Sequence, residues 1–417
     1  MTAHRPRGPV RLAAATLSPM AAAASRVALE RDAGLRARRL RAAAGDRVRQ
    51  RLHPTRPRMR ALVAAPGGRL AWRAAPAPRP PGPDGAVVHP IAVATCDLDR
   101  ALALGATPFA LPLHFGHECV ADVLATGERV RTVRPGDRVV VPFQISCGAC
   151  SACAAGRTAN CRSVPPLSMY GFGVGGGHWG GAVSDELAVP FADAMLVPLP
   201  AGLDPAAAAS VADNVSDAHR HVAPHLPELL RADPEAAVLI LAAQRRRSLF
   251  SPSVALYAGL VARALGARHV RLVDARAGVR AHAERVGLEA LSPAELRGLA
   301  PAPLTVDASA SAGGLRAALS ATAPDGVCTS AGGLHRTARI PTGLLYGRNA
   351  TYHVGRSHAR AGIPAVLELM GGGRLRPEAV TTCLAPIDDA PGALAEHVRG
   401  DGTKTILVEP GARAAAG

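Results

Sequence analysis

The sequence predicts an α/β protein in two parts, an antiparallel β-rich part followed by a doubly wound parallel sheet. Between residues 59 and 200, short strand patterns alternate with Gly and Pro punctuation. From about residue 204 onward, apolar strands alternate with helical segments, which is typical of a parallel sheet with helices on both faces. The 417 residues, 48% of them hydrophobic, are enough to bury two hydrophobic cores.

The β-rich part is predicted from alternation and turn signals. Met59 is expected to open the folded part with a short edge strand. Residues 118–143 alternate apolar and polar side chains around Gly and Pro, as antiparallel strands do. Within them, Pro135-Gly136-Asp137 is a strong turn signal. We therefore expect two antiparallel strands joined by a loop that includes this turn.

The parallel sheet is predicted element by element. An alanine-rich helix is expected over 205–222. The strands that follow are expected at 238–243, 269–274, 304–308 and 326–331, with helices between them at 253–265, 278–286 and 314–321. From about residue 357 the chain returns to a helix and a final strand within 403–409.

The formal net charge of +16 is concentrated at the start of the chain. Residues 1–58 hold fourteen arginines against Glu30, Asp32 and Asp46, a net charge of +11, so the other 359 residues carry +5. This segment has no aromatic residue and no RNA- or DNA-binding motif, so we expect a disordered basic extension and no nucleic-acid partner. A transit peptide and a nucleic-acid-associated protein are the alternatives. No apolar run is long enough for a membrane span, so we expect a cytoplasmic protein without membrane contact.

Four of the eight cysteines form a compact pattern. The spacing C-x2-C-x2-C-x7-C is formed by Cys147, Cys150, Cys153 and Cys161. Four thiolates at this spacing wrap tetrahedrally around one zinc ion and leave no open position for a substrate, so a structural zinc is expected. Gly148 and Gly156 allow the chain to bend between the ligands. Two disulfides or four unrelated thiols are the alternatives.

A second set of potential ligands is dispersed along the chain. Cys96 lies in TCDLD, His117 and Glu118 lie in FGHECV, and Asp213 lies in SVADNVSDA. One thiolate, one imidazole and one carboxylate can hold a zinc ion and leave its fourth position open. The alternatives are a histidine satisfied within the core and an inert buried thiol.

The order of these motifs resembles the zinc-containing medium-chain alcohol dehydrogenases. Cys-x-x-Asp, Gly-His-Glu, Pro-Gly-Asp-Arg-Val, the four-cysteine lobe and a βαβ region follow one another from about Met59 to Val408. The resemblance implies a GroES-like catalytic domain and a Rossmann cofactor domain. Their expected bounds are 59–213 with 357–417 for the catalytic domain, 147–161 for its structural zinc lobe, and 214–356 for the NAD-binding domain.

The resemblance also implies roles for the dispersed set. Cys96 and His117 would be catalytic zinc ligands, and Glu118 would be the nearby acid that supports or transiently replaces a ligand. Asp213 would be the third ligand, at a position where the family more often has Cys or Glu; some members that act on formaldehyde look similar in using Asp. With the lobe, two zinc ions per chain are expected.

One departure concerns the proton of the alcohol. The family usually has Ser or Thr two residues after the first cysteine, and here that residue is Leu98. A water chain or a neighbouring histidine is the expected substitute, with His114 and His178 as candidates by their place near the motifs. The alternative for each histidine is a packing or surface role.

The cofactor site is predicted from the Rossmann resemblance. Asp274 ends a predicted strand and would bind the adenosine ribose, which favours NAD over NADP; the alternative is a helix-capping Asp. Lys404, the only lysine, aligns with a basic residue that the family uses against the pyrophosphate; a surface lysine is the alternative. Gly332 would let the nicotinamide end approach the backbone.

The expected glycine-rich turn is absent. Residues 242–255 contain no glycine and include the arginines 245–247. Ala242 at the start of this segment and Ser253 near its end are expected to contact the cofactor. A side chain at the tight turn hinders close approach to the pyrophosphate, while the arginines attract it. The hypothesis is that NAD affinity is weaker than in typical relatives or that NAD sits differently.

The expected function is a zinc-dependent transfer of a hydride between a small alcohol or aldehyde and NAD, with zinc activating the substrate oxygen. The alternative is a zinc-stabilised protein of this fold with weakened or lost catalysis. Tyr170 and Trp179 are candidates for the substrate pocket, and packing is the alternative. A dimer or tetramer is expected by analogy with the family.

Overall fold

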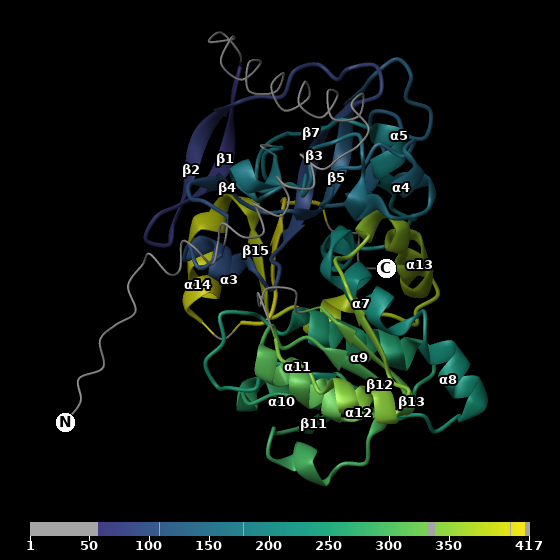
Figure 1. Cartoon of the computed structure of the whole chain (residues 1–417). Coiled ribbons are helices and arrows are strands. Elements are labelled where there is room, and N and C mark those ends of the chain that lie inside the picture. The colour runs from purple at the N-terminus through teal and green to yellow at the C-terminus, as the bar shows by residue number, and fades with distance from the viewer. Residues whose placement is uncertain (1–56, 108, 178, 332–337, 401, 413–417) are drawn as a thin grey trace, which may run out of the picture.

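The computed structural model describes residues 57–107, 109–177, 179–331, 338–400 and 402–412. Figure 1 shows a β-rich layer and a parallel sheet flanked by helices, with the α7 region between them. The predicted α/β fold class is confirmed. Residues 1–56 of the predicted extension lie outside the described residues, and Arg58 already belongs to strand β1, so the extension is shorter than predicted by at least that residue.

The β-rich layer contains a seven-stranded sheet in the order β15-β16-β3-β5-β6-β8, with β7 also paired to β3. All of its pairs are antiparallel except β15 with β16. The strands are β3 (Ala86–Ala94), β5 (Glu118–Thr126), β6 (Arg138–Val141), β7 (Leu187–Val189), β8 (Val197–Pro198), β15 (Cys383–Pro386) and β16 (Thr405–Val408).

The predicted turn between β5 and β6 is confirmed. Gly136 has a φ of 91°, which favours glycine, and the Asp137 side chain accepts a hydrogen bond from the Arg134 backbone N–H at 2.9 Å. The antiparallel pairing of β5 with β6 matches the alternation in the sequence.

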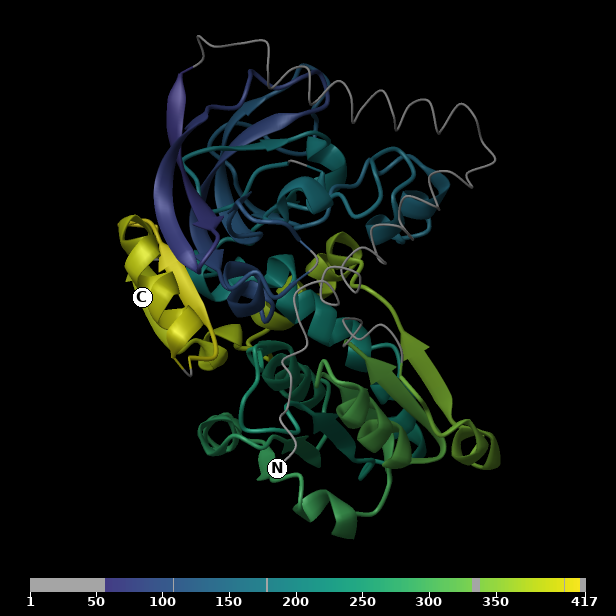
Figure 2. The same ribbon diagram turned by 60° about the vertical axis from the view of Figure 1, so that its left-hand side comes forward.

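A smaller three-stranded sheet packs beside the C-terminal helix. Its strands are β1 (Arg58–Ala65), β2 (Arg69–Pro76) and β4 (Leu113–His114), in the order β2-β1-β4. Figure 2 shows α14 (Ala390–Arg399) beside the β1–β2 hairpin. The Trp72 indole N–H donates to the Asp388 carbonyl at 3.1 Å, just before α14, so the end of the chain is tied to its first strands.

The second sheet is entirely parallel, in the order β11-β10-β9-β12-β13-β14. In order of appearance this is 3-2-1-4-5-6, the arrangement of dinucleotide-binding sheets. Its strands are β9 (Val238–Leu241), β10 (Val270–Val273), β11 (Glu289–Leu291), β12 (Ala302–Asp307), β13 (Thr322–Ser330) and β14 (Thr351–Val354).

Helices cover both faces of this sheet because its strands are apolar on both sides. Val238 and Ile240 pack in one core with α7 (Asn214–Val222) and α9 (Ser253–Ala264). Leu239 and Leu241 face the other way, into a core with α11 (Ala312–Ser320). The other helices are α3 (Asp99–Ala103), α4 (Ser151–Ala154), α5 (Ala192–Met195), α6 (Pro205–Ala208), α8 (Leu226–Ala232), α10 (Ala277–Arg285), α12 (Thr342–Gly347) and α13 (Ala359–Gly371).

The predicted strands and helices of this sheet are present, with ends shifted by a few residues. The predicted helix over 205–222 is interrupted, because Asp213, with φ −146° and ψ −77°, separates a 3-10 turn from α7. The elements α8, β11, α12 and β14 were not predicted. The domain bounds at 213 and 357 stay a prediction. No helix in the described part of the chain is long and apolar enough to cross a membrane.

Candidate functional site

The four-cysteine lobe brings its thiols together. The Sγ atoms of Cys147, Cys150, Cys153 and Cys161 all lie within 4.8 Å of one another. Backbone N–H groups point at the sulfurs, with Arg162 donating to Cys150 Sγ at 3.3 Å. Gly148 has a φ of 71°, and a Cβ there would lie 2.7 Å from the Ala194 Cβ, so the turn between the first two ligands requires glycine. This arrangement fits a closed, structural zinc site.

The dispersed set also converges. Ligand atoms of Cys96, His117, Glu118 and Asp213 lie within 4.8 Å of one another. Cys96 follows β3, His117 and Glu118 stand at the start of β5, and Asp213 precedes α7. The adjacent antiparallel strands β3 and β5 bring the first three together, and the break in the helix turns Asp213 toward them.

The imidazole of His117 is buried without a hydrogen-bond partner among the described residues. The residue is 2% exposed, and both ring nitrogens are buried without a hydrogen bond to any described residue. The nearest carboxylate oxygen, Oδ2 of Asp213, is 3.6 Å from Nε2. A buried imidazole with unsatisfied nitrogens is costly, and a metal ion bound to one ring nitrogen would remove part of that cost.

The charge around Cys96 leads to the same conclusion. Burial, and then the carboxylates of Asp99, Asp213 and Glu118, raise the pKa of the Cys96 thiol well above its usual value. For Cys96 to ionise among these acids, a cation must lie beside its sulfur. A zinc ion would supply that charge, and thiolate, imidazole and carboxylate are ligand types that zinc accepts.

Glu118 is held by the only lysine of the chain. The ammonium of Lys404 lies 3.0 Å from Glu118 Oε2 and donates to Asn214 Oδ1 at 2.9 Å. Lys404 and Glu118 have no exposed surface, so the alternative of a surface lysine is wrong. Burial opposes the charge of Lys404, but Glu118 and other neighbours outweigh it and raise its pKa. Lys404 thus faces the candidate metal cluster, and its predicted contact with a pyrophosphate stays a prediction.

An aromatic wall surrounds His117, and the sequence reasoning did not identify it. The ring centroids of Phe172 and Phe143 lie 4.9 Å and 5.7 Å from that of His117, and Phe109 packs edge-on against Phe172 at 4.6 Å. In a chain with only six phenylalanines, three gather here. Nothing in their local spacing signals this, because they come from separate loops.

The residues considered for the proton relay and the substrate pocket either line a different cavity or pack within the protein. Leu98 packs against the β-rich core, and its backbone N–H donates to Cys96 Sγ at 3.1 Å. His114 and Trp179 line a cavity whose lining contains none of the candidate zinc ligands. Tyr170 is buried and donates to the Ala188 carbonyl at 2.8 Å; its place in the substrate pocket stays a prediction. His178 lies outside the described residues.

The predicted ribose-binding acid is engaged within the chain. Asp274 has no exposed surface. It accepts hydrogen bonds from the backbone N–H groups of Ala243 (3.2 Å) and Arg276 (2.7 Å), and the Arg276 guanidinium lies 2.7 Å from Oδ2. None of these contacts caps α10, whose N-cap is Arg276 and which has no side-chain cap hydrogen bond, so the capping alternative does not hold; the ribose role stays a prediction. Ala242 is buried directly after β9, and Gly332 lies outside the described residues.

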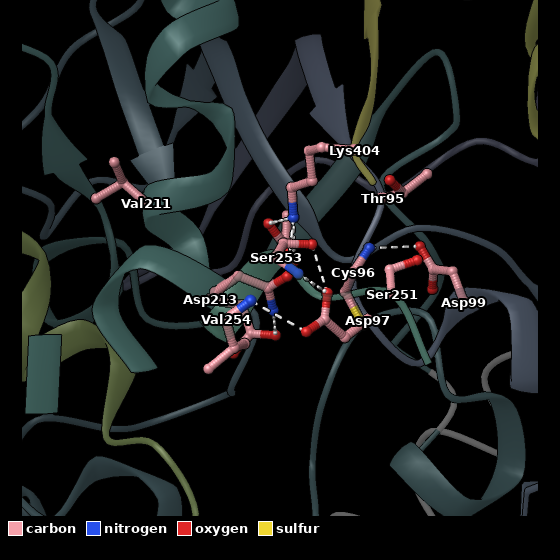
Figure 3. Close-up of polar contacts among 12 residues, drawn as sticks. Thr95, Cys96, Asp97, Asp99, Val211, Asp213, Ser251, Ser253, Val254 and Lys404 are labelled. Carbon is pink, nitrogen blue, oxygen red and sulfur yellow. Dashed lines mark hydrogen bonds and ion pairs between the residues drawn. The ribbon is translucent and has the colours of Figure 1, made fainter. Parts of the chain in front are cut away.

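Ser253, another predicted cofactor contact, opens α9 and is bonded to a residue that sequence reasoning passed over. Asp97, next to Cys96, accepts hydrogen bonds from the Ser253 N–H, the Ser253 hydroxyl and the Val254 N–H (Figure 3). A second acid in TCDLD was the only available signal. Figure 3 shows the Asp97 carboxylate pointing toward Ser253 and Val254.

Comparison with known proteins agrees with this geometry. The alcohol dehydrogenase GroES-like domain matches residues 82–201. A probable zinc-binding alcohol dehydrogenase of Mycobacterium tuberculosis is 31% identical over 351 residues, which is 80% of this chain and 83% of that protein. The chain belongs to the zinc-containing medium-chain alcohol dehydrogenase family.

Membership in this family makes the chain an alcohol dehydrogenase-like oxidoreductase. Among solved structures, the alcohol dehydrogenase TADH from Thermus sp. ATN1 is similar with a TM-score of 0.74 and 27% identity, covering 84% of this chain and 100% of that one. A glutathione-independent formaldehyde dehydrogenase of Bacillus subtilis is 36% identical over 119 residues, 28% of this chain and 29% of that protein. The GroES-like and Rossmann fold predicted from the motifs is thus confirmed.

Proposed function

We propose that this family member transfers a hydride between a small alcohol or aldehyde and NAD, with a zinc ion held by Cys96, His117 and Asp213. The carrying observation is the buried His117 ring, unsatisfied at both nitrogens and surrounded by a thiol and two carboxylates. Zinc at such a site polarises the substrate oxygen and lowers the pKa of an alcohol. The four cysteines of the lobe would hold a second zinc with a structural role.

The residues of the chain would position the substrate at the zinc ion and keep water away from the site. Three protein ligands leave the fourth position for substrate, and the Lys404 ion pair holds Glu118 beside the cluster without exposing it. Phe143 and Phe172 present apolar surface next to His117, which favours a substrate with a small apolar carbon part. Leu98 offers no hydroxyl, so the proton of the alcohol leaves by another route, such as an ordered water chain.

NAD as the hydride acceptor is supported by the 3-2-1-4-5-6 strand order, which is that of dinucleotide-binding sheets. The residues at the expected pyrophosphate position fit a dinucleotide less well. The turn after β9 has no glycine, and the N-terminus of α9 already holds the Asp97 carboxylate. We therefore propose the dinucleotide on the basis of the sheet and derive no step from its contacts.

The test combines metal content with turnover. Zinc-replete protein is expected to hold two zinc ions per chain and to reduce NAD with at least one alcohol of a panel that includes formaldehyde hydrate. Asp213→Asn removes a charged ligand and is expected to leave one zinc and to lower kcat/KM by roughly a hundredfold or more. Asp325→Asn is the matched control, because Asp325 is exposed and has a φ of 54° that Asn adopts equally well.

Two results would contradict the proposal. Full zinc content and full activity in Asp213→Asn would show that Asp213 is not a ligand. Two zinc ions without turnover or NAD binding would favour the alternative, a zinc-stabilised protein that has lost catalysis.

A further inference from the structure

The carboxylate of Asp97 caps a helix that lies 156 residues later in the chain. Oδ1 accepts from the Ser253 backbone N–H at 2.9 Å and from the Ser253 hydroxyl, and Oδ2 accepts from the Val254 N–H at 3.0 Å. Asp97 comes from the loop after β3, whereas Ser253 opens α9 beside the parallel sheet. The contact thus joins the β-rich layer to the first helix that follows β9.

The local sequence gives α9 no cap of its own. Its N-cap residue is Pro252, which has no side-chain acceptor. The first N–H groups of a helix have no partner inside the helix, and Asp97 satisfies two of them. A negative side chain at this end also interacts favourably with the helix dipole. The carboxylate is therefore held by hydrogen bonding and by charge.

The N-terminus of α9 lies where a dinucleotide-binding sheet usually binds phosphate. In a doubly wound sheet, the phosphates of a dinucleotide bind at the N-terminus of the helix after the first strand, where free N–H groups point at them. Here that strand is β9, that helix is α9, and the N–H groups of Ser253 and Val254 are bonded to Asp97. The chain thus places its own anion in the phosphate position.

In the described turn after β9, no glycine provides a second phosphate cradle, although the turn contains the arginines 245–247. Ala242 and Ala243 occupy the turn after β9, where glycine would allow the backbone to approach the ligand. Farther along the same edge, the Asp274 oxygens are bonded to Arg276 and to the backbone. The two contact points of an adenosine diphosphate group are therefore both occupied by groups of this chain.

We propose that Asp97 is a specificity-determining residue: it holds the phosphate position at the N-terminus of α9, so a dinucleotide binds there only by displacing its carboxylate. This inference rests on the proposed function, because it assumes that the parallel sheet receives a dinucleotide. Two effects oppose the ligand. The carboxylate competes for the same N–H groups, and its charge repels the pyrophosphate.

The test measures binding by calorimetry on the full, zinc-replete chain at one fixed ionic strength. The probes are NAD, ADP-ribose and adenosine, which has no phosphate. In Asp97→Asn the side chain keeps an acceptor oxygen but loses its charge, so NAD and ADP-ribose are expected to bind roughly tenfold tighter or more than to the wild type, with adenosine unchanged. Asp97→Ser, a neutral capping residue, is the second variant and is expected to act in the same direction.

Asp204→Asn is the matched control, because Asp204 also caps a helix with its carboxylate, accepting from the Ala206 N–H (2.9 Å), but that helix is α6 instead of α9. It is expected to leave the dinucleotide affinity as in the wild type. The proposal is overturned if both folded Asp97 variants bind NAD no tighter than the wild type, if adenosine gains as much as ADP-ribose, or if the wild type already binds NAD with a Kd below about 1 µM.

The two proposals fail in different ways. Tighter ADP-ribose binding by Asp97→Asn, without turnover of any alcohol by the wild type, would support the role of Asp97 and reject the proposed function. NAD-dependent turnover by the wild type, with unchanged affinity in the Asp97 variants, would support the function and reject the role of Asp97.

Discussion

Lys404 and Glu118 form an ion pair with no exposed surface, separated by 286 residues in the chain. Burying an ion pair removes the hydration of both charges. Each charge is then stabilised mainly by its partner. Asn214 accepts from the same ammonium and also donates to Asp213 Oδ2 at 3.0 Å. Contacts therefore run from Lys404 directly to Glu118 and, through Asn214, to the candidate zinc ligand Asp213.

Removing the lysine is expected to leave the buried Glu118 carboxyl without its ion-pair partner and to raise its pKa further, because burial already raises that pKa and Lys404 opposes the rise. Lys404→Met should lower the free energy of unfolding by about 3 kcal/mol or more, and adding Glu118→Gln should restore a large part of it. Denaturant unfolding of the single and double variants measures this. Arg271→Met, which breaks a pair with the exposed Glu289, is the control, expected to cost less than about 1 kcal/mol. If Lys404→Met/Glu118→Gln is no more stable than Lys404→Met, Lys404 does not compensate the charge of Glu118.

The cysteine lobe is an element with little secondary structure of its own. Between its ligands it contains only α4, of four residues, and a three-residue 3-10 helix at Thr158–Asn160. Segments this short are not stable by themselves, so the metal is expected to define the shape of the lobe.

Loss of one lobe ligand should therefore remove one zinc and unfold the lobe locally. Cys153→Ser is expected to reduce the zinc content from two to one per chain and to lower the free energy of unfolding by about 3 kcal/mol or more. Metal analysis and thermal unfolding measure both. Cys383→Ser is the matched control, because Cys383 is a half-buried thiol that belongs to neither cluster. Unchanged zinc content in Cys153→Ser would show that the lobe holds no metal.

Across the whole molecule, the C-terminal segment connects the two layers. His397 on α14 is 3% exposed, with Nδ1 lying 3.1 Å from the Thr405 hydroxyl of β16 and Nε2 lying 3.4 Å from the hydroxyl of Ser251, just before α9. Burial, and then the charges of Arg100 and Lys404, lower its pKa from 6.5 to about 4. The folded protein thus holds this ring neutral where the unfolded chain would protonate it.

Stability should therefore fall as the solution becomes acidic. Above pH 6.5 the ring is neutral in both states and the full contribution is present; as pH falls from 6.5 toward 4, the unfolded chain binds the proton first and the contribution is lost. The loss is about 3 kcal/mol at most. His397→Gln is expected to flatten this part of the unfolding profile. If the free energy of unfolding of His397→Gln falls as steeply with pH as that of the wild type, His397 is not the group that causes the loss.

Much of the fold and of the two ligand clusters could be predicted from the sequence because these features have local or spaced signatures. Apolar periodicity marked β9, α9, β10 and α11, and cysteine spacing marked the lobe. The edge strands β11 and β14 were missed because their side chains are exposed or half-buried and form no apolar run, whereas β9 and β10 are mostly buried. The predicted helix over 205–222 was wrong at Asp213, where convergence with His117 imposes a non-helical backbone on a helix-forming segment.

The sequence by itself determined the two-part architecture, the family resemblance and the identity of the candidate zinc ligands, since alternation, turns and ligand order are properties of short segments. Only the tertiary structure decided what the polar side chains between them contact. Lys404 turns to Glu118, Asp274 to Arg276, and Asp97 to the N-terminus of α9. The physical reason is that a buried charge takes the nearest complementary group in space, and for Lys404 and Asp97 that group comes from a distant part of the chain.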